Sequence, residues 1–381
     1  MYPRLIAASI AGSKKSVLLL GPRQTGKSTL MRGLGPEMAI NLERETEFLA
    51  FAGNPAELEQ RLAARPATTV FIDEVQRLPS MLNTIQAILD ETPRPPKFLL
   101  TGSSARKLRR GQANLLPGRI HHYLMGPIVA AEADYALDTK TVLAIGSLPG
   151  ILSEPDGAQR RQTLRSYAAT YVREEVQAEG LTRNIEGFSR FILLAAAMCT
   201  HFLDHAKLSR EAAVARQSSI RFFEILEDTL IVRRCEAFTK SLTRRLVSHP
   251  RYFFYDNGVL CGLLNNFEPS ADRVGALFEN LVFTQLVHSA AARGEEILVT
   301  SYRTEHGAEV DFIVEYKGSL WAVEVKATAN LSRSDLTGLR SFAEYYGRPH
   351  QKVIAVPAGT PKVIEGVSVL PWQSLLKEIG L

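Results

Sequence analysis

Cysteine is scarce in this sequence, and no long run of apolar residues occurs in it. The three cysteines are Cys199, Cys235 and Cys261. Their odd number and irregular spacing argue against a disulfide framework and against a cysteine-ligated metal site, and they favour a reducing compartment. The apolar run FILLAAAM at residues 191–198 is far shorter than the roughly 20 residues that a membrane-spanning helix requires. We therefore expect a cytoplasmic protein without a membrane partner.

Export signals, low-complexity tracts and fixed-period repeats are also missing from the sequence. Hydrophobic residues make up 45% and charged residues 22% of the chain, which is close to the average for soluble globular proteins. The whole chain should therefore fold. Its 381 residues are too many for one ordinary core, so we expect several domains. The formal net charge of +5 neither identifies nor excludes a polyanionic partner.

Apolar runs alternate with helical patterns over residues 1–125. The runs SVLLL, EMAINL, TTVFI and KFLLTG are predicted strands, and helical stretches separate them. Continuous apolar strands connected by helices are typical of a parallel sheet that is covered on both faces. We therefore predict an α/β domain over this region.

Three further regions follow this predicted domain. Residues 126–188 have mainly helical patterns and are expected to form a lid or connector. Residues 189–247 show three short helical patterns and then the strand-like TLIVRRCEAF, which is the plan of a winged helix-turn-helix. In residues 248–381, closely spaced strands such as EVDFIVEYKG and SLWAVEVKAT indicate a separate α+β unit.

The segment GPRQTGKST at residues 21–29 matches the phosphate-binding loop G-x-x-x-x-G-K-[ST] in full. In this motif the glycines let backbone N–H groups surround the phosphates, Lys27 reaches the terminal phosphates, and the Ser28 hydroxyl binds Mg²⁺. A chance glycine turn is the alternative, but the position directly after the strand SVLLL is the context that the motif needs. The sequence therefore predicts an MgATP site.

Carboxylates complete the predicted nucleotide site. VFIDE places Asp73 and Glu74 at the end of an apolar strand, where Asp73 would hold the Mg²⁺ and Glu74 would activate the attacking water. Thr101 or Ser103, at the end of the strand KFLLTG, could contact the terminal phosphate or the water. Arg23, Arg106 and Arg119 are candidates for stabilising the charge of that phosphate. We assign Lys27, Glu74 and Arg119 as catalytic. The expected nucleotide contacts are Gly21, Gln24, Thr25, Gly26, Lys27, Ser28, Thr29, Asp73 and Ser103.

GPRQTGKST, VFIDEVQRLP, FLLTGSS and LPGRI together resemble the AAA-type ATPases of bacteria and archaea that carry a C-terminal domain of uncharacterised function. The similarity continues through GSLPG and YFFYDNGVL to GAEVDFIVE and so covers nearly the whole chain. It implies an ASCE-type P-loop ATPase, a winged-helix segment and a C-terminal domain similar to the PD-(D/E)xK nucleases, which have a restriction-endonuclease-like fold. A second sensor arginine after the lid is not evident, which departs from ring-forming motors.

Asp311, Glu324 and Lys326 form a D-x12-E-x-K pattern on two adjacent predicted strands. Metal-dependent nucleases need carboxylates that hold Mg²⁺ or Mn²⁺ and a lysine near the attacking water. The nuclease resemblance adds Glu279 on the preceding helix, so the predicted metal ligands here are Glu279, Asp311 and Glu324, with Lys326 as a catalytic residue. An ordinary solvated hairpin face is the alternative, and the pattern alone does not separate the two.

The predicted winged helix offers a set of polar side chains to a nucleic acid. Winged helices also dock onto proteins, so both kinds of partner stay open. The candidate nucleic-acid contacts are Gln217, Ser219, Arg221, Arg233 and Arg234.

The sequence thus favours an ATPase that is coupled to a nuclease-like domain acting on or binding DNA, with ATP and ADP as ligands. One alternative is a nucleotide-dependent switch or scaffold whose C-terminal domain binds a protein and cuts nothing. Another is a chain in which only the C-terminal site acts while ATP stabilises the fold. A homo-oligomer is compatible with each of these.

Overall fold

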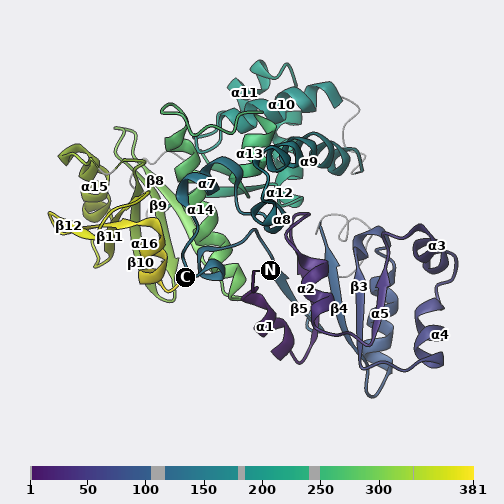
Figure 1. The fold of residues 1–381 in the computed structure, drawn as a ribbon. Coiled ribbons are helices and arrows are strands. Elements are labelled where there is room, and N and C mark those ends of the chain that lie inside the picture. Colours follow the sequence, from purple (N-terminus) through teal and green to yellow (C-terminus); the bar gives the residue numbers. More distant parts are fainter. Residues whose placement is uncertain (1, 104–115, 179–184, 240–248, 329) are drawn as a thin grey trace.

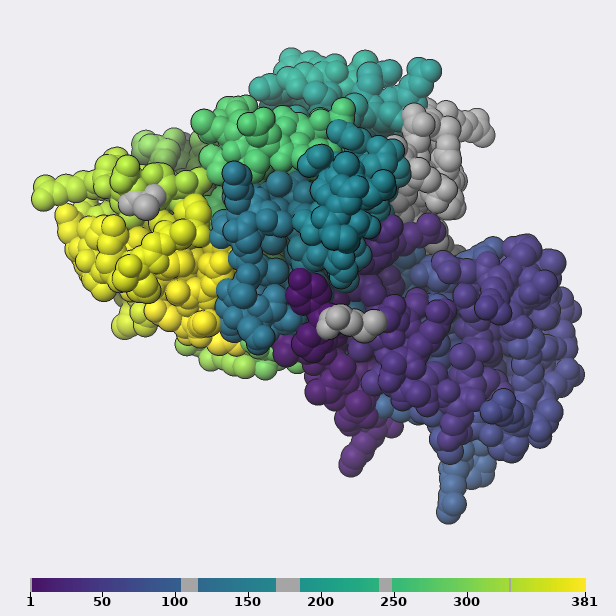
Figure 2. All heavy atoms as spheres, in the orientation of Figure 1, coloured from purple at the N-terminus to yellow at the C-terminus, as the bar shows by residue number. Residues whose placement is uncertain are grey.

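The computed structural model of this chain comprises an N-terminal α/β unit, a helical region and a C-terminal α+β unit (Figure 1). Figure 2 shows the first unit as a lobe that projects from the rest of the molecule. Arg106 lies outside the described residues. No helix in the described part of the chain is long and apolar enough to cross a bilayer. The structure describes residues 2–103, 116–178, 185–239, 249–328 and 330–381, with the side chains of 169–178 and 185 left out.

The N-terminal unit contains a five-stranded parallel sheet in the order β2-β3-β4-β1-β5. Its strands are β1 (Ser16–Leu20), β2 (Met38–Asn41), β3 (Thr69–Asp73), β4 (Lys97–Gly102) and β5 (Ile120–Leu124). The helices are α1 (Ile6–Gly12), α2 (Lys27–Gly33), α3 (Glu45–Gly53), α4 (Glu57–Ala64) and α5 (Met81–Glu91), with a 3-10 turn η1 (Val75–Arg77). The predicted parallel sheet is confirmed, and β4 lies between β1 and β3.

Both faces of this sheet are covered, as the continuous apolar strands predicted. Leu18 and Leu20 of β1 belong to one buried cluster, whereas Val17 and Leu19 belong to another on the opposite face. Successive side chains of a strand point to opposite faces, so a strand that is buried on both sides must be apolar at every position.

The middle of the chain is mostly helical in the described residues. Asp138 caps the start of α7, because its side chain accepts a hydrogen bond from the Thr141 N–H. Asp204 caps α11 in the same way. The elements are η2 (Ala130–Ala133), α7 (Thr139–Ile145), α8 (Pro149–Ser153), α9 (Gly157–Ala178), α10 (Ile185–Ala197), α11 (His205–Glu211) and α12 (Arg216–Asp228).

Two antiparallel strands follow α12, namely β6 (Val232–Ala237) and β7 (Arg251–Phe254), and α13 (Asn257–Leu263) comes next. The boundary predicted between residues 247 and 248 therefore lies between two paired strands. β6 also pairs in parallel with β8 of the C-terminal unit. As a result, the strand pair extends the C-terminal sheet.

The C-terminal sheet has eight strands in the order β12-β13-β11-β10-β9-β8-β6-β7. β8, β9 and β10 are successively antiparallel, and β11 lies parallel to β10. The remaining elements are α14 (Val274–Ala292), β8 (Leu298–Arg303), β9 (Glu309–Tyr316), β10 (Ser319–Val325), η3 (Arg333–Leu336), α15 (Thr337–Tyr346), β11 (Gln351–Val356), β12 (Lys362–Ile364), β13 (Val367–Pro371) and α16 (Trp372–Ile379).

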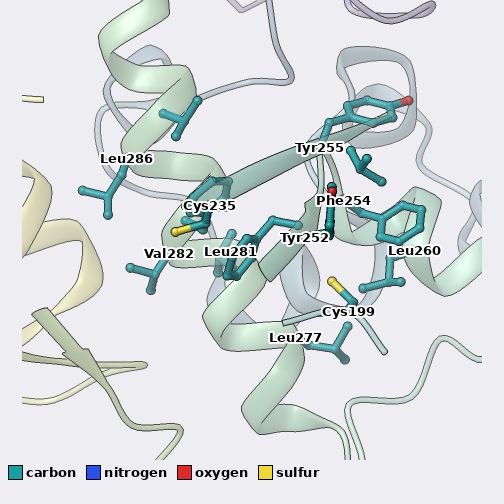
Figure 3. Close-up of a cluster of buried hydrophobic side chains, with 14 of the residues drawn as sticks. Cys199, Cys235, Tyr252, Phe254, Tyr255, Leu260, Leu277, Leu281, Val282 and Leu286 are labelled. Carbon is teal, nitrogen blue, oxygen red and sulfur yellow. The ribbon is translucent and has the colours of Figure 1, made fainter. Parts of the chain in front are cut away.

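The helical region and the C-terminal unit share one hydrophobic core. It runs from Ala130 to Leu381 and includes most of the apolar side chains of α14, which is buried along most of its length. Figure 3 shows Leu277, Leu281 and Val282 of α14 in this cluster, with Tyr252 and Phe254 of β7 among the other labelled side chains. These two parts of the chain are consequently stabilised together.

The three cysteines are buried, and none of them forms a disulfide. Burial raises the pKa of the Cys199 and Cys235 thiols to about 12 and that of Cys261 to about 11. The thiols are therefore protonated and pack as small apolar groups.

Asp256 is a buried carboxylate at the junction between the helical region and β7. Its Oδ2 atom accepts from the Ser147 N–H at 2.7 Å, and its Oδ1 atom accepts from the N–H groups of Gly258 at 2.8 Å and Val259 at 3.1 Å. Burial nevertheless raises the pKa of Asp256 to about 6. The folded state thus holds this proton more tightly than the unfolded chain does.

The raised pKa of Asp256 predicts a pH-dependent loss of stability. Stability contributed by the protonated carboxyl is present below the unfolded pKa near 4 and is lost as the pH rises to about 6. Relative to Asp256→Asn, the wild type should lose about 3 kcal/mol of unfolding free energy between these limits. Urea denaturation from pH 4 to pH 8 measures this difference. Asp134→Asn, at an exposed position, should keep the wild-type profile.

Candidate functional site

The phosphate-binding loop connects β1 to α2 and contains two glycines with different steric roles. A Cβ atom at Gly21 would overlap the Met125 carbonyl oxygen, because the chain after β5 passes directly beside the loop. Gly26 has φ +90°, a left-handed conformation that side chains rarely adopt. The loop ends on the first turn of α2, whose free N–H groups form an anion site.

Lys27 is buried and lies across this loop. Its Nζ atom donates to the carbonyl oxygens of Gly21 at 2.7 Å and Pro22 at 2.8 Å. These neutral acceptors hold the ammonium group inside the loop, where a phosphate oxygen would be a stronger acceptor. Thr25 is also buried, and its hydroxyl donates to the Pro22 carbonyl at 2.9 Å.

Ser28 and Asp73 meet at the end of β3. The Ser28 hydroxyl donates to Asp73 Oδ1 at 2.7 Å, and the Thr101 hydroxyl donates to the same oxygen at 2.6 Å. Arg32 of α2 makes an ion pair with Asp73 Oδ2 at 3.0 Å. Hydroxyl and carboxylate oxygens are the ligands that Mg²⁺ prefers, so these residues fit the predicted MgATP site.

Glu74 follows β3 in a left-handed conformation, with φ 56° and ψ 48°. Its side chain accepts a hydrogen bond from the Gln76 amide, which also donates to Ser103 Oγ at 3.0 Å. Gln76 Oε1 is buried without a hydrogen-bond partner among the described residues. Burial raises the pKa of Glu74, whereas the nearby charge of Lys27 lowers it. Gln76 therefore sets the position of the predicted catalytic carboxylate.

Arg4 joins the loop to the segment after β5, and the sequence patterns did not identify it. Its guanidinium pairs with Glu132 at 3.0 Å and donates to the carbonyl oxygens of Thr25 at 2.7 Å and Gly126 at 2.8 Å. No motif includes this residue, because its partners are distant in sequence. Arg32 and Gln76 were missed as well, although both lie within a few residues of motif positions.

The loop also contacts the helical region. The Tyr167 hydroxyl of α9 donates to the Arg23 carbonyl at 3.3 Å, and the Tyr255 hydroxyl donates to Tyr167 Oη at 2.7 Å. Tyr255 directly follows β7. A short hydrogen-bonded path therefore leads from the phosphate-binding loop to the C-terminal sheet.

Arg119 does not reach the nucleotide site of its own chain. It precedes β5 and pairs with Asp90 at the end of α5, at 2.5 and 2.8 Å. The start of β5 lies beside the start of β1, whereas the phosphate-binding loop follows the end of β1. Because the strands are parallel, the two positions are on opposite edges of the sheet, and the predicted catalytic role of Arg119 within one chain is wrong.

The candidate nucleic-acid residues lie in different surroundings. Gln217 and Arg221 are exposed on α12, as a contact would require. Ser219 is fully buried, and its hydroxyl contacts the His205 ring at 3.4 Å, so its predicted contact is wrong. Arg233 and Arg234 line a cavity of about 400 Å³ between β6, α14 and the phosphate-binding loop.

The C-terminal carboxylates lie together, but an arginine lies among them. The Arg251 guanidinium pairs with Glu279 and lies 3.7 Å from Asp311 Oδ1. Glu324 instead pairs with Lys326 at 2.9 Å, and burial raises the pKa of Glu324 to about 8. No group of three or more acidic, histidine or cysteine side chains in the described ranges is arranged to hold a metal ion. The residues as placed do not fit the predicted second metal.

Residues 13–133 match the sequence model of a family described as an AAA domain. Together with the phosphate-binding loop and the parallel sheet, this match supports an AAA-type ATPase with an α/β P-loop fold, and with it nucleotide binding and ATP hydrolysis. Residues 137–270 and 274–375 match two families that are each described as a domain of unknown function, DUF8612 and DUF4143.

Particular relatives extend the similarity to nearly the whole chain. The uncharacterized proteins Rv2008c of Mycobacterium tuberculosis and Mb2031c of Mycobacterium bovis are each 27% identical over 382 aligned residues, which cover 95% of this chain and 83% of the relative. A solved structure of Pif1 helicases at forked double-stranded DNA is 14% identical, covers 42% of this chain and 49% of its own, and has a TM-score of 0.24. The solved structure of a DNA replication initiation factor is 11% identical, covers 58% of this chain and 86% of its own, and has a TM-score of 0.27. TM-scores this low do not establish a shared fold.

The close approach at Gly21 predicts a steric effect on stability. In Gly21→Ala the new methyl group would force the loop away from the end of β5, which should cost about 1–3 kcal/mol of unfolding free energy. Gly33→Ala is the matched control, because its Cβ would meet no atom within 4 Å and helical alanine is favourable. Urea denaturation of both variants measures the difference. Equal stability of the two would contradict the close approach.

Proposed function

We propose that this protein binds MgATP between α2 and the end of β3, hydrolyses it, and uses the nucleotide state to control its binding to DNA. The observation that carries the ATPase part is the contact between Ser28 and Asp73 at 2.7 Å, beside the buried Lys27 and Glu74. Bound Mg²⁺ would supply positive charge at the terminal phosphates.

The side chains around the loop divide the work of binding and hydrolysis. Lys27 exchanges its contacts with the Gly21 and Pro22 carbonyls for phosphate oxygens, while the N–H groups at the start of α2 surround the phosphates. Ser28 and Asp73 would supply oxygen ligands to a bound Mg²⁺. Glu74 orients the attacking water and accepts its proton, and burial, which raises the pKa of this carboxylate, makes it a stronger base.

Two substitutions separate ATP binding from hydrolysis. Lys27→Ala should lose most of its affinity for MgATP, because a charge-assisted contact to phosphate disappears. Glu74→Gln should bind MgATP normally and turn over about 10²- to 10⁴-fold more slowly, the usual contribution of a general base. Calorimetric titration and phosphate release measure these effects. Glu59→Gln, on an exposed face of α4, should retain wild-type turnover, and equal turnover in all proteins would remove the assignments.

The arrangement of residues 185–254 supports a winged helix-turn-helix as the DNA-binding part. α10, α11 and α12 precede the antiparallel strands β6 and β7, and an isolated bridge pairs Phe202 with Arg251. In such a unit the last helix enters the major groove. α12 exposes Arg216, Gln217 and Arg221, which suits contacts to phosphates and base edges.

DNA binding through α12 would depend on salt and on its arginines. Arg216→Ala and Arg221→Ala should each weaken binding to a DNA duplex and reduce the salt dependence by about one released counterion. Fluorescence anisotropy at about 50 to 200 mM salt covers the range in which such contacts are lost. Arg94→Ala, in the loop before β4, should match the wild type. Unchanged affinity and slope in both α12 variants would favour a protein partner.

The order of elements in the C-terminal unit supports a nuclease-like fold, but the ion pairs of its carboxylates do not support cleavage. Helix α14, the antiparallel strands β8 to β10, helix α15 and the parallel strand β11 follow one another in the order expected for a restriction-endonuclease-like core. The ion pairs of Arg251 favour the second candidate function, in which the protein is a nucleotide-dependent switch and this unit binds without cutting.

A further inference from the structure

We propose that Arg251 is the resident cation of the C-terminal carboxylate cluster and that it excludes a divalent metal ion from this cluster. The carboxylate cluster consists of Glu279 on α14 and Glu309 and Asp311 on β9. The Arg251 guanidinium pairs with Glu279, and its Nη1 atom lies 3.9 Å from Glu309 Oε1 and 3.7 Å from Asp311 Oδ1. The positive charge thus lies where carboxylates from two elements converge.

Arg251 is held in this position by contacts that do not involve the carboxylates. Its side chain is only 3% exposed, and its Nε atom donates to the Thr200 carbonyl at 2.5 Å. The guanidinium carbon lies 5.2 Å from the ring centres of both Phe202 and Phe253. The backbone of Arg251 is fixed as the first residue of β7. The guanidinium therefore belongs to the packed interior and does not reach the cluster from a free surface.

A metal ion would have to displace this guanidinium. Arginine cannot be deprotonated in proteins, so the displaced group would remain a buried charge without its carboxylate partners, which is strongly unfavourable. The remaining predicted ligand does not compensate for this cost. Glu324 pairs with Lys326, while Asp311 Oδ2 already accepts from the Val325 N–H at 2.7 Å. The cluster consequently has its positive charge from the protein itself.

Glu279 and Asp311 therefore have a structural role. Arg251 belongs to the β6–β7 strand pair, and Glu279 and Asp311 belong to the C-terminal unit. Their ion pairs attach the strand pair to α14 and β9. Metal-dependent cleavage of a phosphodiester needs a cation that polarises it and supplies hydroxide, and a guanidinium can do only the first. The C-terminal unit as folded should bind its partner without cutting a phosphodiester bond.

Manganese binding, measured by electron paramagnetic resonance without nucleotide, tests this proposal. The comparison uses the wild type, Asp311→Asn, Arg251→Met and the double variant Arg251→Met/Asp311→Asn. The wild type and Asp311→Asn should bind Mn²⁺ equally weakly, with no component that depends on Asp311. Arg251→Met should gain one site with an affinity at least about tenfold higher, because the carboxylates lose their internal cation. The double variant should lose that site again.

Two results would overturn the proposal. The first is Mn²⁺ binding by the wild type that disappears in Asp311→Asn, and this comparison needs no change at position 251. The second is a folded Arg251 variant that gains no Asp311-dependent site. Arg251→Gln, which keeps hydrogen-bond donors, replaces Arg251→Met if circular dichroism shows that the latter does not fold. Because nucleotide is absent, neither result depends on the proposed ATPase activity.

Discussion

The parallel alignment of β1, β4 and β3 is the constraint on which the nucleotide site depends. Parallel strands bring their carboxyl ends to one edge of the sheet, so the loop after β1, the acids after β3 and the polar residues after β4 meet there. Ser28 lies 45 residues before Asp73 and Thr101 lies 28 residues after it, yet both hydroxyls donate to the Asp73 carboxylate. The same alignment places Arg119 beside the amino ends of the strands, where it pairs with Asp90.

A second constraint governs the rest of the chain. α14 is buried along most of its length, and its apolar side chains pack against both the helical region and the C-terminal sheet. β6 and β7 also belong to the same sheet as β8 to β13. A strand pair that shares its sheet and its core with its neighbours cannot turn as an independent body.

Sequence patterns predicted the parts of the molecule that are local. The apolar strands, the phosphate-binding loop and the acids Asp73 and Glu74 all lie within short motifs, and the parallel sheet and the AAA-domain match agree with them. Contacts between distant segments left no such pattern. Arg4 meets Glu132 across 128 residues, and Arg251 meets Glu279 from another element. The prediction for Ser219 was wrong because this residue lies on the face of α12 that packs against other elements, together with Phe222 and Phe223.

β7 contributes to both sites through its two ends. Arg251 at its start is fixed among the carboxylates, and Tyr255 just beyond its end is connected through Tyr167 to the Arg23 carbonyl. A strand of this length spans about 13 Å and resists stretching, since its backbone is already extended. A displacement of the phosphate-binding loop must therefore either move the whole strand or break one of the two hydrogen bonds made by the Tyr167 hydroxyl. The longer of these two hydrogen bonds, from the Tyr167 hydroxyl to the Arg23 carbonyl at 3.3 Å, is thus the weaker contact between the phosphate-binding loop and the C-terminal sheet.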